Sequence, residues 1–155
     1  MRISTTRAIA LPLTLVLLLV ASSLTLSAVP QPALTNYNAL FQYNGTTLFN
    51  IGVNYGFPLS PIPVSDPDGD SWGFGFSVTR DQLEMQVAPG GGPNSTLEPF
   101  VFYASNLGPG KVTGVQVPQG FPFTVLFSSD SVTVLSTTTV HVTQILNATI
   151  TITRG

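Results

Sequence analysis

The chain has 155 residues, enough for one domain with a hydrophobic core of its own. It contains no cysteine, which excludes disulfide bonds, thiolate metal ligands and cysteine nucleophiles. Only 8% of the residues are charged, against about 25% in an ordinary soluble domain, and they comprise 7 acidic and 5 basic residues. This balance argues against nucleic acid as a partner, because nucleic-acid binding requires a basic surface. Either Ser, Thr, Asn and Gln solvate the surface, or sugar or neighbouring subunits cover it.

A hydrophobic segment occupies residues 1–28, and we expect residues 8–28 to contact a membrane before or after processing. The basic start MRISTTR and the apolar run ALPLTLVLLLVA are typical of a secretory signal peptide. Signal peptidase would cut between Ser23 and Leu24, with Ala21 and Ser23 at the positions where small residues are selected. Alternatively the segment stays as a membrane anchor, since about twenty apolar residues suffice to span a bilayer.

The residues RAIA, from Arg7 to Ala10, resemble the cleavage site of archaeal type IV prepilins. In that family a basic residue and a small residue precede the cut, and the apolar helix after it is retained. The resemblance implies a cut between Ala8 and Ile9 and a subunit that self-associates into an extracellular filament. Pro12 would be the fourth mature residue, where proline is tolerated because the first helical N–H groups have no intrahelical partner.

Residues 29–38 form a proline-containing linker or tail, and residues 39–155 follow as one β-domain. If signal peptidase removes the leader, residues 24–29 (LTLSAV) begin the mature chain with apolar and small polar side chains in alternation. Pro30 and Pro32 prevent this tail from folding back as an ordinary central strand. Such a tail could add as a strand to the sheet edge of the next subunit. A filament subunit is therefore compatible with either cut, with a helix or a donated strand as the connector.

From Ala39 onward, apolar and polar side chains alternate with the period of β-strands. Asn44-Gly45 predicts a two-residue type I′ hairpin turn, because both positions of that turn need a positive φ. Turn signals recur roughly every eight to twelve residues, which predicts an all-β, Ig-like β-sandwich after the hydrophobic segment. Two Pro/Gly-rich stretches, PLSPIPVSDPDGDS and APGGGPNSTLEP, are expected to be loops. The predicted strands are ALFQY, TTLFNIGVNY, WGFGFSVT, QLEMQV, FVFYA, VTGVQV, FTVLF, SVTVL, TVHVTQI and ATITIT.

The run YASNLGPGKVTGVQV is similar to the strand, Asn-x-Gly turn and strand of Ig-like domains in archaeal pilins and other prokaryotic surface proteins. The matching residues are Asn106 and Gly108 in the turn, and Val112, Val115 and Val117 on the returning strand. The similarity implies a cell-surface protein and assigns no chemistry.

The stretch SDPDGDSW contains the best candidate for a metal site. Asp66, Asp68 and Asp70 stand at alternate positions, so their three carboxylates could converge on one hard cation such as Ca²⁺. The stretch is not an EF-hand loop, because the glycine is at Gly69 and Ser77 stands where the bidentate glutamate is required. The alternative is a Pro-Asp-Gly turn whose acids face water. Calcium is the only cofactor that the sequence suggests.

Three N-glycosylation sequons begin at Asn44, Asn94 and Asn147. The first two fall in predicted turns, where a glycan can be accommodated, whereas the neighbours of Asn147 have a strand pattern. His141 is the only histidine and shares the polar side of its predicted strand, so we expect it at the surface. The sequence contains no nucleophile elbow and no phosphate-binding glycine loop, and an enzyme is not expected.

These features predict an exported, all-β structural protein, most simply a subunit of an extracellular archaeal filament. The competing class is a surface binding module, anchored or released, that uses loop tips such as SDPDGDSW to recognise sugar or a partner protein. A viral envelope or coat component would have a similar composition. All three readings place the protein outside the cell or on its surface.

Overall fold

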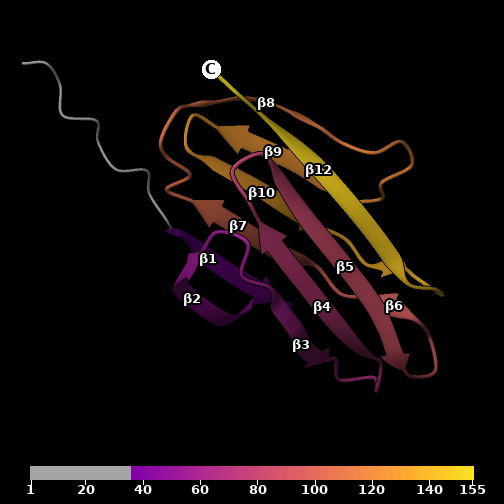
Figure 1. The fold of residues 1–155 in the computed structure, drawn as a ribbon. Helices are drawn as coiled ribbons and strands as arrows, with labels where there is room; N and C mark the ends of the chain where they lie inside the picture. Colours follow the sequence, from indigo (N-terminus) through magenta and orange to yellow (C-terminus); the bar gives the residue numbers. More distant parts are fainter. Residues whose placement is uncertain (1–35) are drawn as a thin grey trace, which may run out of the picture. The chain divides into compact units, whose positions relative to one another are not determined.

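The computed structural model describes residues 36–155. These residues form a β-sandwich, in which the alternating apolar side chains of the strands face the space between two sheets (Figure 1). The first sheet has the strand order β2-β1-β7-β10-β9 and the second sheet has the order β3-β4-β5-β12-β8, while β6 and β11 form a separate pair. The all-β, sandwich-like prediction is therefore confirmed. The strands are β1 (Asn36–Tyr43), β2 (Thr46–Asn54), β3 (Leu59–Ser65), β4 (Ser71–Val78), β5 (Gln82–Gly91), β6 (Thr96–Leu97), β7 (Phe100–Ser105), β8 (Val112–Gln116), β9 (Thr124–Ser128), β10 (Ser131–Ser136), β11 (Val140–His141) and β12 (Leu146–Arg154).

The predicted leader and both predicted processing sites lie outside the described residues, as does the tail at residues 24–29. Residues 36–155 contain no helix that is long and apolar enough to cross a membrane. Residues 8–28, for which membrane contact is predicted, also lie outside the described part of the chain.

Aromatic rings fill the space between the two sheets. Phe41 on β1 packs against Phe74 and Phe76 on β4, with ring centroids 4.9 and 5.4 Å apart. Phe76 also stacks on Phe102 of β7. These contacts place β1 and β7 of the first sheet directly over β4 of the second, and large aromatic side chains contribute much of the buried area that stabilises such a core. The alternation predicted for WGFGFSVT is confirmed, because its apolar members are the buried ones: Trp72, Phe74, Phe76 and Val78.

The turn between β1 and β2 has the predicted backbone. Asn44 has φ +49° and Gly45 has φ +77°, so both central residues adopt the left-handed conformation of a type I′ turn. The hairpin brings β2 against β1, and β2 has no other neighbour in the first sheet. The turn sets the pairing of the first residues of β2, and a register shift opposite Phe41 places Phe49, Ile51 and Val53 on the core-facing side.

The prediction that PLSPIPVSDPDGDS is entirely a loop is wrong, because its first half forms β3. Two prolines, Pro61 and Pro63, are accommodated because β3 is a lateral strand that pairs only with β4. A register irregularity between Leu59 and Ile62 accompanies them. APGGGPNSTLEP is likewise not purely a loop, since β5 extends to Gly91 and β6 follows.

The predicted strand TVHVTQI is much shorter in the structure. Only Val140 and His141 form a strand, because their partner β6 offers just Leu97 and Thr96 for pairing. Val142 still donates its N–H to the carbonyl of Ser95, at 2.9 Å. A segment with alternating hydrophobic residues thus forms a strand only where a neighbouring strand provides hydrogen-bond partners for its backbone N–H and C=O groups.

Candidate functional site

The core-facing side of the lateral strand β2 is only partly covered. Ile51 lies opposite Ala39 in the ladder with β1, so both side chains point to the same face of the sheet. Ala39 is fully buried, but Ile51 is 47% exposed. Phe49, two residues earlier on the same face, is only partly buried, against the ring of Phe41. Val53, two residues after Ile51 on this face, is buried, so the apolar interior is open only around Phe49 and Ile51.

A groove of about 620 Å³ lies beside this edge, between the β1–β2 hairpin and β3. The register of β2 slips opposite Phe41, and the extra residue at the bulge is Leu48. Leu48 is 42% exposed and lines the groove together with Pro63 and Val64 of β3. Among residues 36–155, no charged residue lines the groove; the other lining residues are Tyr43, Asn44, Thr46, Ser65 and Pro67.

An exposed sheet edge is a template for pairing with another strand, and proteins usually protect such edges with charges or prolines. β3, the neighbouring edge of the second sheet, has Pro61 and Pro63, whereas the nine residues of β2 include neither a proline nor a charge. β9, at the far edge of the first sheet, is also uncharged, but it has only five residues. It also lies beside β8, where Val112 donates its N–H to the carbonyl of Ser129. β2 is thus the longer unprotected edge of this sheet.

The structure brings together the three aspartates predicted as metal ligands. One carboxylate oxygen from each of Asp66, Asp68 and Asp70 lies within 4.8 Å of the other two. These residues, the aspartate cluster, occupy the turn between β3 and β4. Two backbone hydrogen bonds close the turn, from the N–H of Asp66 to the carbonyl of Asp70 at 3.0 Å and from Gly69 to Asp66 at 3.1 Å.

Asp70 holds the loop between β5 and β6 against this turn. Its carboxylate is fully buried and accepts the N–H of Asn94 together with the N–H and the hydroxyl of Thr96, each at 3.0 Å. These hydrogen bonds, first of all the one from the Thr96 backbone, lower the pKa of Asp70. Gly92 is needed where the loop passes, because it has φ +137° and a Cβ there would collide with Asp70. Neither the spacing nor the composition of the sequence predicted this connection.

Asp66 and Asp68 are less completely satisfied. Asp66 is 8% exposed, and its Oδ1 accepts the N–H of Asp70 at 3.0 Å. Its buried Oδ2 has no hydrogen-bond partner among residues 36–155. Burial, and next the neighbouring carboxyl group of Asp68, raise the pKa of Asp66 to about 6. The exposed Asp68 accepts a hydrogen bond from the side-chain amide of Asn94 at 3.2 Å.

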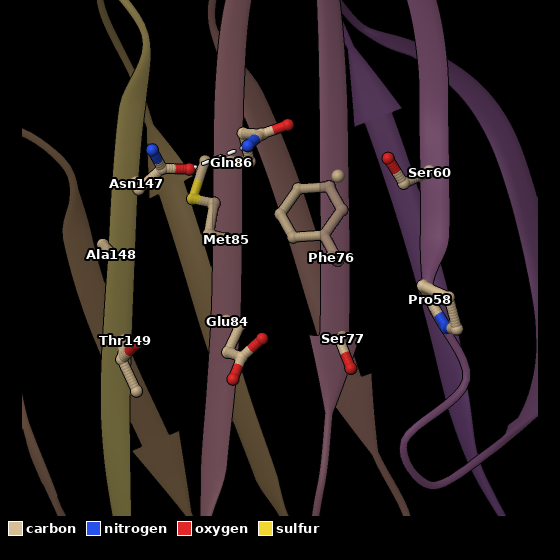
Figure 2. Close-up of a pocket in the computed structure, with 11 residues that line it drawn as sticks. Pro58, Ser60, Phe76, Ser77, Glu84, Met85, Gln86, Asn147, Ala148 and Thr149 are labelled. Atoms are coloured by element: carbon tan, nitrogen blue, oxygen red, sulfur yellow. Dashed lines mark hydrogen bonds between the residues drawn. The ribbon is translucent and has the colours of Figure 1, made fainter.

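A polar depression of about 330 Å³ lies on the outer face of the second sheet (Figure 2). Gly75 forms part of its floor, and a Cβ at this position would approach the hydroxyl of Ser60 to 3.0 Å. Glu84, Gln86 and Asn147 line the depression, and Gln86 donates a hydrogen bond to Asn147 at 2.8 Å. Glycine in β4 therefore marks the close approach of a side chain from β3, and it leaves room for polar groups from β5 and β12.

The three sequons differ in their surroundings. Asn44 is exposed at the tip of the β1–β2 turn. Asn147 is exposed within β12, where its side chain is bonded to Gln86. The side-chain amide of Asn94 and the hydroxyl of Thr96, the two groups that glycosylation requires, are both bonded to the aspartate cluster. Asn44 is the sequon that the fold presents most openly.

No protein-family model, curated protein or solved structure matches the chain. Its function is therefore inferred from three features of the described domain. These are the open edge at β2 with its groove, the aspartate cluster, and the polar depression on the second sheet.

Proposed function

We propose that the protein is a structural subunit of an extracellular, cell-surface filament, and that subunits join by adding a strand at the β2 edge. The observation that carries this proposal is the exposure of Ile51, which faces the core from an uncharged strand. An added strand would satisfy the free backbone groups of β2 and cover the apolar surface of Ile51 and Leu48. Main-chain hydrogen bonds to β2 would supply most of the binding affinity, and the groove would determine which side chains of the added strand fit.

The occupant we propose is the segment at residues 24–29 of a neighbouring subunit. Six extended residues span about 20 Å, which suffices to cover the exposed part of β2 from Leu48 to Gly52. Leu24, Leu26 and Ala28 alternate with Thr25 and Ser27, so one face of residues 24–28 suits the groove and the other suits water. Pro30 and Pro32 limit the pairing at its end, since proline has no N–H to donate.

Donor and acceptor are different parts of the subunit in this arrangement. A head-to-tail interface of this kind produces an open fibre unless the rotation between subunits closes a ring. The low charge of the chain agrees with a surface that neighbouring subunits cover. We include in this proposal an Ig-like relationship of the domain, export through the N-terminal hydrophobic segment, and glycosylation at Asn44.

The proposal is tested with two matched double variants of the donor segment. Leu24→Asp with Leu26→Asp places two charges on the face directed at the groove, and we expect monomers instead of filaments by electron microscopy. Thr25→Asp with Ser27→Asp places the same charges on the opposite face, and we expect filaments to remain. Mass spectrometry of the secreted protein verifies the mature N-terminus, which we expect at Leu24.

Filaments that still form from the Leu24, Leu26 variant would overturn the donated strand as the connector. A mature N-terminus at Ile9 would instead favour the retained helix of the pilin-like alternative. Monomers from the wild-type chain under all conditions of secretion would contradict the filament itself.

A second candidate function is a surface binding module, and the polar depression favours it. Glu84, Gln86 and Asn147 present planar polar groups on one concave surface, which suits the hydroxyl groups of a sugar (Figure 2). Binding to a glycan array that Gln86→Ala abolishes, without any effect on filament formation, would support this candidate.

A further inference from the structure

The aspartate cluster concentrates negative charge where the described domain has few basic groups. Glu98 also lies near the aspartate cluster, since its negative charge raises the pKa of Tyr43, as the charges of Asp66 and Asp70 do. The only lysine and arginine residues of the described chain are Arg80, Lys111 and Arg154. They gather at the other end of β4. Arg154 bonds the carbonyl of Arg80 just beyond that strand, and Lys111 pairs with the residue after Arg154. His141 is exposed on β11, opposite Thr96. No lysine or arginine therefore accounts for the charge of the cluster.

The unpartnered oxygen of Asp66 shows that the cluster is incomplete as protein alone. This side chain is more than nine-tenths buried, and its Oδ2 receives no hydrogen bond within residues 36–155. Burying an unsatisfied carboxylate oxygen costs free energy, and the nearby carboxylate of Asp68 increases that cost. Either a proton or a cation at this position removes the penalty. Because one oxygen of each of the three aspartates lies within 4.8 Å of the other two, a cation among them removes the repulsion between all three.

We propose that a divalent cation of the Ca²⁺ type binds between Asp66, Asp68 and Asp70 and joins the β3–β4 turn to the β5–β6 loop. The donors are all oxygens, which suits a hard cation, whereas Zn²⁺ prefers histidine nitrogen and cysteine sulfur. Ca²⁺ accepts an irregular set of six to eight oxygens, with water at the positions that the protein leaves open.

Asn94 is placed to complete the site from the facing loop. Its side-chain amide nitrogen lies 3.2 Å from Asp68, and a half-turn of the amide would direct its oxygen to the same region. Since Asp70 already holds the backbone of Asn94 and Thr96, a cation ligated by Asn94 would connect the two loops a second time. Ca²⁺ therefore stabilises this end of the sandwich whether or not the chain assembles.

The test uses the secreted protein, stripped of divalent cations with EGTA and titrated with CaCl₂ or MgCl₂ by calorimetry. We expect one Ca²⁺ per chain, and a rise of about 10 °C in the unfolding midpoint at a Ca²⁺ concentration of roughly a hundred times Kd. Mg²⁺ should bind more weakly, because it requires near-octahedral geometry and gives up its water reluctantly. Proteolysis of the β5–β6 loop should be slower with Ca²⁺ than with EGTA.

Two conservative variants locate the site. Asp66→Asn and Asp68→Asn should each weaken Ca²⁺ binding at least tenfold while leaving the unfolding midpoint in EGTA unchanged or higher. The amide at position 66 keeps an oxygen for the Asp70 N–H, and each change removes a like charge. Glu84→Gln on β5 removes an acid outside the cluster and should leave binding unchanged. Equal midpoints in Ca²⁺ and EGTA, or undiminished binding by both cluster variants, would overturn the proposal.

Discussion

Ala39 and Ile51 lie directly opposite each other in the β1–β2 ladder, yet Ala39 is fully buried and Ile51 is 47% exposed. Directly paired residues of an antiparallel sheet point to the same face, so both belong to the core side. The second sheet covers β1 through Phe74 and Phe76. On β2, Val53 is buried on the same face, whereas Ile51 is left half exposed. An apolar side chain on the core side of an uncovered, uncharged edge is what strand addition from another chain would bury.

Ile51→Lys should abolish assembly without unfolding the subunit. Because half of Ile51 is already exposed, we expect the free energy of unfolding of the monomer to change by less than about 1 kcal/mol. Asn50→Lys on the opposite side of β2 is the matched control and should still assemble. Urea denaturation measures stability, and electron microscopy or light scattering measures assembly. Equal assembly of the two variants would show that the core side of β2 is not the contact.

The second position of the β1–β2 turn should require glycine, because its φ is positive. Gly45→Val forces a β-branched residue to φ +77°, and we expect a loss of more than about 1 kcal/mol in the free energy of unfolding. Gly52→Ala on β2 provides the control, since that glycine has open space around it and no positive φ. Chemical denaturation compares the two, and an unchanged midpoint for Gly45→Val would contradict the turn.

Two buried tyrosines should respond in opposite ways to loss of the hydroxyl. The hydroxyl of Tyr37 is buried without a partner among residues 36–155, so Tyr37→Phe should leave stability unchanged or raise it by up to about 1 kcal/mol. The hydroxyl of Tyr43 accepts the N–H of Glu98 at 3.1 Å, and Tyr43→Phe should cost about 1 kcal/mol. Calorimetric melting at neutral pH measures both, and destabilisation by Tyr37→Phe would contradict the unpaired hydroxyl.

The same tyrosines should make the domain sensitive to alkali. Burial raises the pKa of Tyr37 and of Tyr43 from 10.0 to about 12. A folded-state pKa above the unfolded value means that the stabilisation is complete below pH 10 and is lost as the pH rises toward 12, by about 2 kcal/mol for each group. Unfolding free energies between pH 9 and pH 12 should fall less steeply for Tyr37→Phe than for the wild-type protein. Identical slopes would contradict the raised pKa of this group.

Arg154 should hold together the end of the sandwich opposite the aspartate cluster. Its guanidinium donates hydrogen bonds to the carbonyl oxygens of Arg80, Leu107 and Gly110, which belong to two different loops. Arg154→Met leaves these carbonyls without their donor and should cost about 2–3 kcal/mol. Arg80→Met is the control, because Arg80 takes part through its backbone and should lose little. Since the partners of Arg154 are neutral carbonyls, the loss of unfolding free energy caused by Arg154→Met should be the same in 1 M salt. A loss that decreases with salt would indicate that Arg154 forms an ion pair instead.

Much of the fold is encoded in local patterns. The alternation in WGFGFSVT and QLEMQV predicted the buried faces of β4 and β5, because side chains alternate across any strand. Asn44-Gly45 predicted its turn, since few other residue pairs adopt two positive φ angles in succession. The spacing of Asp66, Asp68 and Asp70 indicated a cluster, because residues this close in sequence can converge within one turn.

The tertiary structure decided what depends on neighbours far away in the sequence. β3 forms in spite of Pro61 and Pro63 because it lies at an edge, and no local pattern states which strand will be lateral. Asp70 became a buried anchor because a loop 24 residues away donates three hydrogen bonds to it. Ile51 shares its face of β2 with Val53, yet Ile51 is 47% exposed and Val53 is buried, a difference that the alternation in the sequence does not predict. Sequence alone thus determined the faces of the strands with a clear alternation, such as β4 and β5. The packing of the sheets determined the strands at the edges and which faces remain open, because burial is a property of both surfaces in contact.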